Sequence, residues 1–200
     1  DILLAGRFSS NVNTSQNYLV FNLTDTLRLI NISGETFLSK FNDNGNYLWA
    51  KKIDTINHSF ISNISTDTYK NIFIGGNRLY KYDSNGNLIW TKVISNGRIT
   101  DIVNNGVSNY STIWFIDSVK YDNLKIYSQG IKSILVKTNI NSGNIEWHSK
   151  PYDLGFSSLY TNNKGISSMT GSTFYSILEK NLLYNNDRKI GYMICFNDTS

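Results

Sequence analysis

The chain has 200 residues, 40% of them hydrophobic and 14% aromatic, which is enough apolar material for a buried core in one large domain or two small ones. Its net charge is +4, but Lys and Arg are scattered singly or as the pair Lys51–Lys52, so a dedicated nucleic-acid surface is not indicated. No stretch approaches the roughly 18 continuous apolar residues that cross a bilayer, so no membrane span is expected.

The composition favours strands over helices. The chain contains 13 Tyr and 10 Phe together with many Ile, Val and Thr, whereas Ala and runs of good helix formers are nearly missing. Asn is the most prominent polar residue, with 28 copies. We therefore predict an all-β, Asn-rich chain.

One sequence unit returns along the chain. The segment TFLSKFNDNGNYLWAKKI (36–53) recurs as RLYKYDSNGNLIWTKVI (78–94), and more loosely as SILVKTNINSGNIEWHSK (133–150). In each copy an alternating apolar strand precedes a short turn, and the next strand carries a tryptophan at a fixed place. Alternation predicts that these tryptophans pack between neighbouring sheets. They are Trp49, Trp90 and Trp147.

Each copy of the unit has a glycine in its turn. Gly45 and Gly86 follow Asn, and Gly143 follows Ser. Tight connections between two antiparallel strands need residues that tolerate a positive φ, which glycine does without steric cost. Each copy is therefore expected to be a hairpin.

A second hairpin precedes this one, which gives four strands in a complete unit. The units are expected at about 1–53, 54–94, 95–150 and 151–200. Their strands, in chain order, are expected at 1–8, 36–41 and 46–53; at 59–66, 71–76, 78–82 and 87–94; at 99–104, 111–117, 132–138 and 144–149; and at 156–161, 165–171 and 190–196.

These motifs resemble a known family. The pattern of Lys40 to Lys51 followed by Asp67 to Gly75, found again in Lys81 to Lys92, is similar to the bacterial β-propeller repeats called SBBP repeats. The resemblance weakens after residue 95, where the Asp-x-x-x-Asn spacing is lost. It implies an all-β propeller of four-stranded antiparallel blades. Because the chain starts at the second strand of a unit and ends at the third strand of another, we expect a piece of a longer propeller, or closure by atypical strands.

In a propeller the three longest connections would lie on one face. They are 9–35, 118–131 and 172–189, and each is expected between the second and third strands of a unit. Long connections often carry function, and mixtures of Tyr and Arg are typical of interfaces. The alternative is that the loops vary in length and their tyrosines pack locally. The candidate binding residues are Tyr18, Phe21, Arg28, Tyr121, Lys125, Tyr127, Tyr175, Tyr184 and Arg188.

No catalytic or metal-binding constellation is recognisable in the sequence. Only two histidines occur, His58 and His148, and the single cysteine, Cys195, lies in a predicted strand, so a zinc site or a Cys/His pair is not expected. Asp43 and Asp83 lie in Asx-Gly turns that lack the spacing of a calcium loop, and we interpret them as turn residues. No cofactor is expected.

The third copy of the unit also resembles the repeat of PQQ-type propellers, which would imply a quinoprotein dehydrogenase. Enzymes of that class use an adjacent cysteine pair and a calcium held by acidic and amide side chains, and the single Cys195 does not provide the pair. We therefore expect a non-catalytic propeller that acts as a scaffold or binds a protein or glycan through the face with the long connections. A structural component of a virus particle or surface layer, and a propeller enzyme acting on glycans, are the alternatives. An extracellular or virion location would be compatible, but the sequence assigns none.

Overall fold

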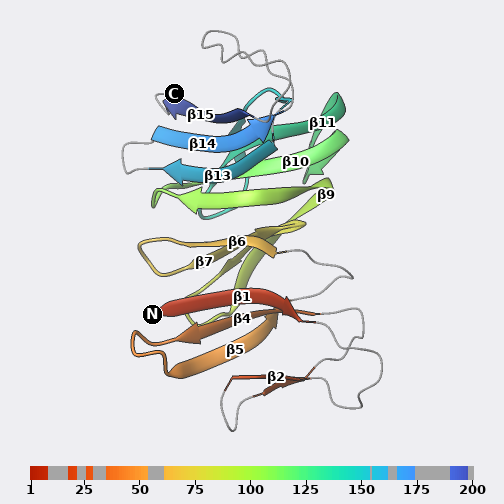
Figure 1. Cartoon of the computed structure of the whole chain (residues 1–200). Coiled ribbons are helices and arrows are strands. Elements are labelled where there is room, and N and C mark those ends of the chain that lie inside the picture. The colour runs from red at the N-terminus through yellow and green to blue at the C-terminus, as the bar shows by residue number, and fades with distance from the viewer. Residues whose placement is uncertain are drawn as a thin grey trace. The chain divides into compact units, whose positions relative to one another are not determined.

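A computed structural model describes residues 1–8, 18–21, 26–28, 35–53, 61–153, 155–161, 166–173 and 190–197 (Figure 1). Over these residues the chain forms strands and turns without a helix, and the paired strands whose register is defined are all antiparallel. The predicted all-β class is therefore confirmed. The chain divides into two compact units, Asp1–Ile61 and Ser62–Ser200.

The first unit is built around a three-stranded sheet in the order β1-β4-β5. Its strands are β1 (Ile2–Phe8), β4 (Glu35–Phe41) and β5 (Tyr47–Ile53), and a separate small hairpin is formed by β2 (Tyr18–Val20) and β3 (Thr26–Arg28). The central strand β4 is the most buried, since Phe37 is 7% and Leu38 1% exposed.

The second unit begins with a seven-stranded sheet in the order β12-β11-β10-β9-β8-β7-β6. Neighbours in this order are also consecutive in sequence, so the sheet is a meander. Its strands are β6 (Ile61–Thr66), β7 (Ile72–Gly76), β8 (Arg78–Tyr82), β9 (Leu88–Asn104), β10 (Ser108–Tyr121), β11 (Leu124–Asn139) and β12 (Ile145–His148).

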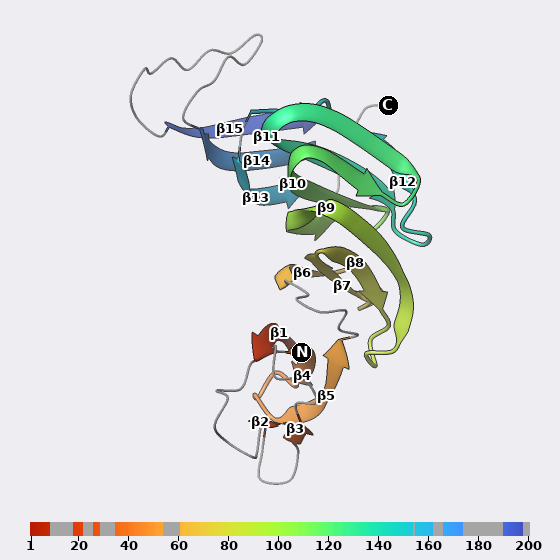
Figure 2. The same ribbon diagram turned by 90° about the vertical axis from the view of Figure 1, so that its right-hand side faces the viewer.

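The 17-residue strand β9 is strongly curved (Figure 2). It pairs with β8 over Leu88–Val93 and with β10 over Ile94–Asn104. The bend coincides with Asn96, whose φ is 61°, and with Gly97, where a Cβ would lie 2.9 Å from the Trp114 carbonyl oxygen. A side chain there would collide with β10, so Gly97 allows the two strands to approach at the bend.

The bend folds β7 and β8 over β10 and β11. The apolar side chains between them form the larger core of the unit. Gly75 permits β7 to lie close to the second half of β9, because a Cβ at this position would lie 2.6 Å from Ile99 Cγ2. The fully buried members of this core include Phe73, Leu79, Ile99, Ile113, Phe115, Ile134 and Val136.

A third sheet packs on the opposite face of β9–β11. It has the order β13-β14-β15, formed by β13 (Gly155–Thr161), β14 (Ile166–Thr173) and β15 (Ile190–Asn197). A smaller core lies between this sheet and the previous one. Its buried residues are Tyr110, Leu135, Phe156 and Leu159.

The sequence-based strand positions hold well for β6, β7 and β8, but two expectations are corrected. The segment 118–131 is not a loop, because β10 and β11 continue through it as a paired hairpin. The strands expected at 87–94 and 99–104 are one continuous strand, because β9 runs from Leu88 to Asn104. Closed, separate blades are not shown.

Three sheet segments carry the same cross-strand triplet, in which a residue of one strand faces a lysine on the next and that lysine faces a tryptophan on the third. A bulge follows the lysine in all three cases. Trp90 packs against the larger core, which lies within the folded seven-stranded sheet, whereas Trp147, on a four-residue strand, remains 41% exposed. The triplets are Leu3–Lys40–Trp49, Phe73–Lys81–Trp90 and Tyr110–Lys137–Trp147.

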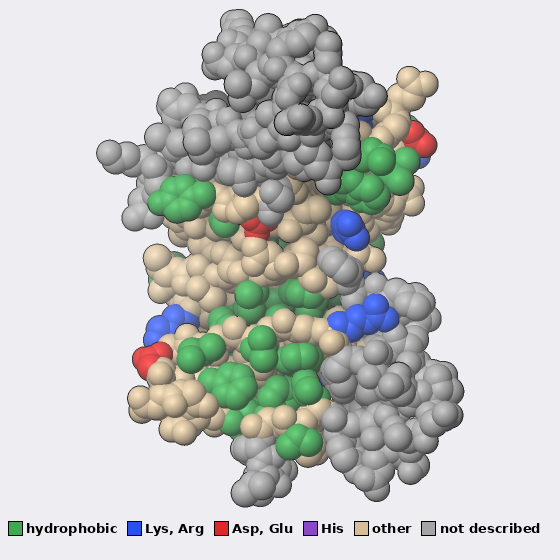
Figure 3. Space-filling view, in the orientation of Figure 1, with side chains coloured by type: hydrophobic (Ala, Val, Ile, Leu, Met, Phe, Trp, Pro, Cys, Tyr) green, Lys and Arg blue, Asp and Glu red, His purple; other side chains and the backbone are tan. Residues whose placement is uncertain are grey.

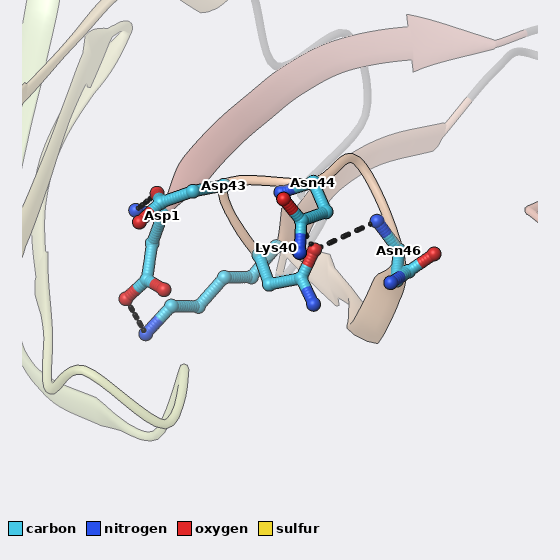
Figure 4. Close-up of polar contacts among 6 residues, drawn as sticks. Asp1, Lys40, Asp43, Asn44 and Asn46 are labelled. Carbon is cyan, nitrogen blue, oxygen red and sulfur yellow. Dashed lines mark hydrogen bonds and ion pairs between the residues drawn. The ribbon is translucent and has the colours of Figure 1, made fainter.

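The turns after these lysines are held by Asx side chains. Asn42 Oδ1 accepts the backbone N–H groups of Asn44 and Asn46 at 3.0 and 2.9 Å, and Lys40 beside it pairs with Asp1 (Figure 4). The turn glycines have positive φ values of 78° at Gly45, 73° at Gly86 and 69° at Gly143.

The Asp-x-x-x-Asn motif also holds a turn together by side-chain hydrogen bonds. Asp67 Oδ1 accepts the N–H groups of Tyr69 and Asn71, and its Oδ2 accepts from the Asn71 amide at 2.8 Å. Asp83 does the same with Asn85 and Asn87. These carboxylates therefore have a turn-forming role that explains the spacing without a metal ion.

Candidate functional site

The structure describes the side-chain surroundings of four of the candidate binding residues named from the sequence. Tyr121, Lys125 and Tyr127 lie in the second unit, and Phe21 lies in the first. Tyr175, Tyr184 and Arg188 lie outside the described residues. Tyr18 and Arg28 lie in β2 and β3 and face each other in the register, but their side chains are not described.

Phe21 packs locally on the sheet of the first unit. Its ring stacks on Tyr47 with centroids 5.5 Å apart and meets the edge of Phe37 at 5.7 Å. Such pairs stabilise packing beyond simple burial. These ring contacts anchor the segment 18–21 on the sheet.

Tyr121 belongs to the core, not to a binding surface. Its side chain is 2% exposed and its hydroxyl donates a hydrogen bond to the Gly143 carbonyl oxygen at 3.0 Å. Burial, assisted by the negative charge of Asp122, raises the pKa of Tyr121 far above its ordinary value. Its burial continues the alternation of Ile113, Phe115 and Val119 on the core face of β10, which the sequence interpretation missed because it treated 118–131 as a loop.

Lys125 and Tyr127 lie together on an extended hairpin, residues 116–132 of β10 and β11, which we call the arm. The arm contains a bulge, since the register passes from Ile116–Ile131 directly to Ser118–Tyr127. Asp117 has a φ of 58° there and accepts the Gly130 N–H at 2.7 Å. This arrangement keeps Val119 and Ile126 in the core while their alternating neighbours face outward.

The outward face of the arm is apolar and aromatic. Ile116 and Ile131 are direct cross-strand neighbours, 49% and 58% exposed, and Tyr127 is 68% exposed. The ammonium of Lys125 lies 4.7 Å from the centre of the Tyr127 ring. Figure 3 shows apolar side chains over this end of β10 and β11, at the upper right. Single exposed apolar residues need no explanation, but a paired group of three suggests contact with another molecule.

The same face continues towards β9 through a second cation–aromatic pair. Arg98 on β9 faces Trp114 on β10 in the register, and the guanidinium carbon lies 5.1 Å from the indole ring centre. The face therefore combines rings and cations at two places, a combination that is common at interfaces.

Positive charge is left in excess near the tip of the arm. Lys120 and Lys125 are direct cross-strand neighbours and both are exposed. Like charges in this position repel each other and destabilise a sheet. The nearby Asp122 does not compensate fully, because its carboxylate pairs with Lys92 at 2.7 Å. The lysine pair costs stability in the chain alone, which is the kind of conflict expected at a binding site.

A second exposed apolar group lies in the first unit, over the sheet β1-β4-β5 (Figure 3). It includes Ile2 and Leu4 on the edge strand β1, each 51% exposed. Neither residue was identified from the sequence, because both belong to an alternating strand pattern that reads equally well as half-buried. The charged groups next to them pair with each other, since the Lys40 ammonium lies 3.0 Å from the Asp1 carboxylate.

The described residues hold no group of three or more His, Cys, Asp or Glu side chains that could bind a metal ion. His148 Nδ1 lies within hydrogen-bond distance of the Ser149 carbonyl oxygen, at 2.9 Å. The side chain of Cys195 and the whole of His58 lie outside the described residues. No helix long and apolar enough to cross a membrane occurs in the described ranges.

Two buried charged groups have structural partners. Lys81 is 5% exposed and donates to the Ile140 carbonyl oxygen at 2.9 Å, and burial lowers its pKa although Asp67 opposes the shift. Asp101 is 4% exposed and contacts the Asn63 amide and the backbone N–H groups of Ile102 and Leu159. Asp101 thus connects β6 and β9 of the seven-stranded sheet to β13 of the third sheet. Lys81 connects β8 to the turn that follows β11 within the seven-stranded sheet, and both groups are buried.

Comparison with known proteins finds no family model and no curated protein that matches the chain.

Proposed function

We propose that the chain is part of a β-propeller and acts as a non-catalytic binding module whose partner docks on the arm. Three observations support the propeller: the common cross-strand triplet, the Asx turns that follow it, and the face-to-face packing of successive antiparallel sheets in the second unit. The resemblance of the motifs to SBBP repeats agrees with them.

One observation carries the binding role. The arm exposes the Ile116–Ile131 pair and Tyr127 on one face, beside two lysines that repel each other. Folding alone does not require this, because the opposite face of the same hairpin already supplies Val119, Tyr121 and Ile126 to the core. A partner would cover the apolar group and neutralise the lysines.

The test uses the full chain and a variant with Ile116→Ser, Tyr127→Ser and Ile131→Ser. Because the three side chains are exposed, the variant should keep the wild-type melting temperature within a few degrees. Both proteins are applied to an array of synthetic peptides and purified glycans. We expect some array members to bind the wild-type chain and to lose at least tenfold affinity for the variant. Binding that is the same for both proteins, or no binding at all, would refute the arm as the site.

A matched variant controls for the loss of apolar surface elsewhere. Ile2→Ser and Leu4→Ser remove two side chains of similar exposure from β1 in the first unit. This variant should bind the same array members as the wild-type chain. Equal losses in both variants would instead indicate nonspecific adhesion through exposed apolar groups.

A further inference from the structure

Among the residues that the structure describes, none forms a strand beside the outer edge of β11 along the arm. β12 pairs with β11 only over Val136–Thr138, and Ser133 forms an isolated bridge with Tyr152. From Leu124 to Lys132 no described strand lies beside β11 on the side away from β10. An edge of this kind presents backbone N–H and C=O groups that another chain can pair with.

We propose that the arm binds an extended, acidic segment of another protein, which adds to the sheet as a strand beside residues 124–132 of β11. This inference rests on the proposed function, and it specifies the class of partner and the way it is held. Main-chain hydrogen bonds would provide part of the affinity, and alternating side chains of the added strand would meet the outward face of the arm.

The positive charge of the lysines on the arm favours an acidic partner. β11 contains Lys125, Lys132 and Lys137 and no acidic residue. Lys132 already pairs with Asp153, so Lys125 and its cross-strand neighbour Lys120 remain as the positive pair at the tip. Carboxylates on the added strand would lie within reach of this pair and relieve its repulsion.

The same charges disfavour a second copy of this chain as the occupant. Two copies paired edge to edge along β11 would bring the lysines of both copies together without acidic residues from either strand. The backbone edge favours a peptide over a polysaccharide, because a sugar chain has no alternating N–H and C=O groups to pair with it, and the apolar pair Ile116–Ile131 offers a sugar no hydrogen bonds. A peptide with alternating acidic and apolar side chains satisfies both features.

The bulge limits the length of the added strand. Asp117 and Gly130 interrupt the pairing of the arm, so the regular part of the β11 edge extends from Leu124 to about Ser128. Bulges bend an edge and restrict indefinite pairing. We therefore expect the added strand to pair regularly along Leu124 to Ser128, to bend where the bulge begins, and to end within residues 124–132 rather than extend into a growing sheet.

The probes are four end-blocked ligands: an eight-residue peptide of alternating Glu and Val, the same peptide with alternate backbone nitrogens methylated, a peptide of alternating Lys and Val, and polygalacturonate. Binding to the full chain is measured by isothermal titration at low salt. We expect the Glu-Val peptide to bind, and the methylated peptide, which keeps the charges but lacks half of the N–H donors, to bind at least tenfold more weakly. The Lys-Val peptide and polygalacturonate should not bind measurably.

Charge-reversal variants locate the site. Lys125→Glu should weaken the Glu-Val peptide at least tenfold, whereas Lys70→Glu, at an exposed turn residue of the same unit, should change its affinity less than twofold. Near-ultraviolet circular dichroism verifies that both variants are folded. If the methylated peptide binds as tightly as the Glu-Val peptide, strand addition is overturned. If polygalacturonate binds more tightly than the Glu-Val peptide, a peptide partner is overturned. In either case, binding that depends on the arm would still support the proposed function. Failure of every probe to bind in an arm-dependent way would overturn the inference, and the array experiment above then decides separately on the proposed function.

Discussion

The carboxylate of Asp101 provides the most demanding test of the packed sheets in the second unit. It is 4% exposed and accepts hydrogen bonds from the backbone N–H of Ile102 at 2.8 Å and of Leu159 at 2.5 Å, in addition to contacting the Asn63 amide. In Asp101→Asn the oxygen that accepts from Leu159 can be replaced by an amide NH2. The Leu159 N–H then loses its acceptor.

The expected cost follows from these contacts. A hydrogen bond to a charged group contributes about 1.5–3 kcal/mol, and a buried unsatisfied donor costs about 1–3 kcal/mol. The lower desolvation cost of the neutral amide offsets part of this, so we expect Asp101→Asn to lower the free energy of unfolding by about 2–3 kcal/mol. Asp101→Ala should cost more, about 3–4 kcal/mol, because all three contacts are lost.

The assay is urea denaturation followed by tryptophan fluorescence. The control is Asp153→Asn, which removes the carboxylate of an exposed ion pair with Lys132 and should change the free energy by less than about 1 kcal/mol. If Asp101→Asn unfolds at the same urea concentration as the wild-type chain, the account of Asp101 as a link between β6, β9 and β13 is wrong.

Two further predictions concern single residues of the same unit. Lys70 in the turn 67–71 has a φ of 65°, close to the 73° of Gly86 in the turn 83–87. Because glycine adopts a positive φ without steric cost, Lys70→Gly should stabilise the unit by up to about 1 kcal/mol, and Gly86→Ala should destabilise it by about 1 kcal/mol. Urea denaturation measures both changes in the free energy of unfolding. Opposite results would show that the side chains, and not the backbone conformation, control these turns. Burial lowers the pKa of Lys81 in the folded chain below its ordinary value of 10.5. At a pH between the lowered pKa and 10.5, the Lys81 side chain is therefore more often protonated in the unfolded chain than in the folded one. The free energy of unfolding should consequently increase as the pH rises through this range. The increase should vanish in Lys81→Met when unfolding is measured between pH 8 and 10.5, and an unchanged slope in that variant would contradict the assignment.

Local sequence signals predicted the strands and turns that depend on neighbouring residues. The run Ile72–Gly75 predicted β7, and the Asn-Gly pair at residues 85–86 predicted the hairpin of β8 and β9, because alternation and positive φ are properties of a few consecutive residues. The pairing of each lysine with its tryptophan is also local, because the two residues lie on either side of one hairpin turn.

Features that depend on distant residues were not predictable in the same way. The continuity of β9 depends on Gly97 meeting Trp114 and Val119 across the sheet, which its own sequence does not reveal. The arm was mistaken for a loop because Ser118 to Ile131 contains Gly130 and polar residues, and the bulge that keeps it paired uses Asp117 from the opposite strand. Asp101 gave no signal at all, since its three partners are separated from one another in the chain.

A strand that adds to the outer edge of β11 would cover the backbone amides of that edge, and hydrogen–deuterium exchange with and without the Glu-Val peptide measures this directly. The peptide should slow exchange at backbone amides of residues 124–132 and leave the turns at 67–71 and 83–87 unchanged. Protection that is absent from residues 124–132, or that is confined to the first unit, would rule out this edge as the binding site.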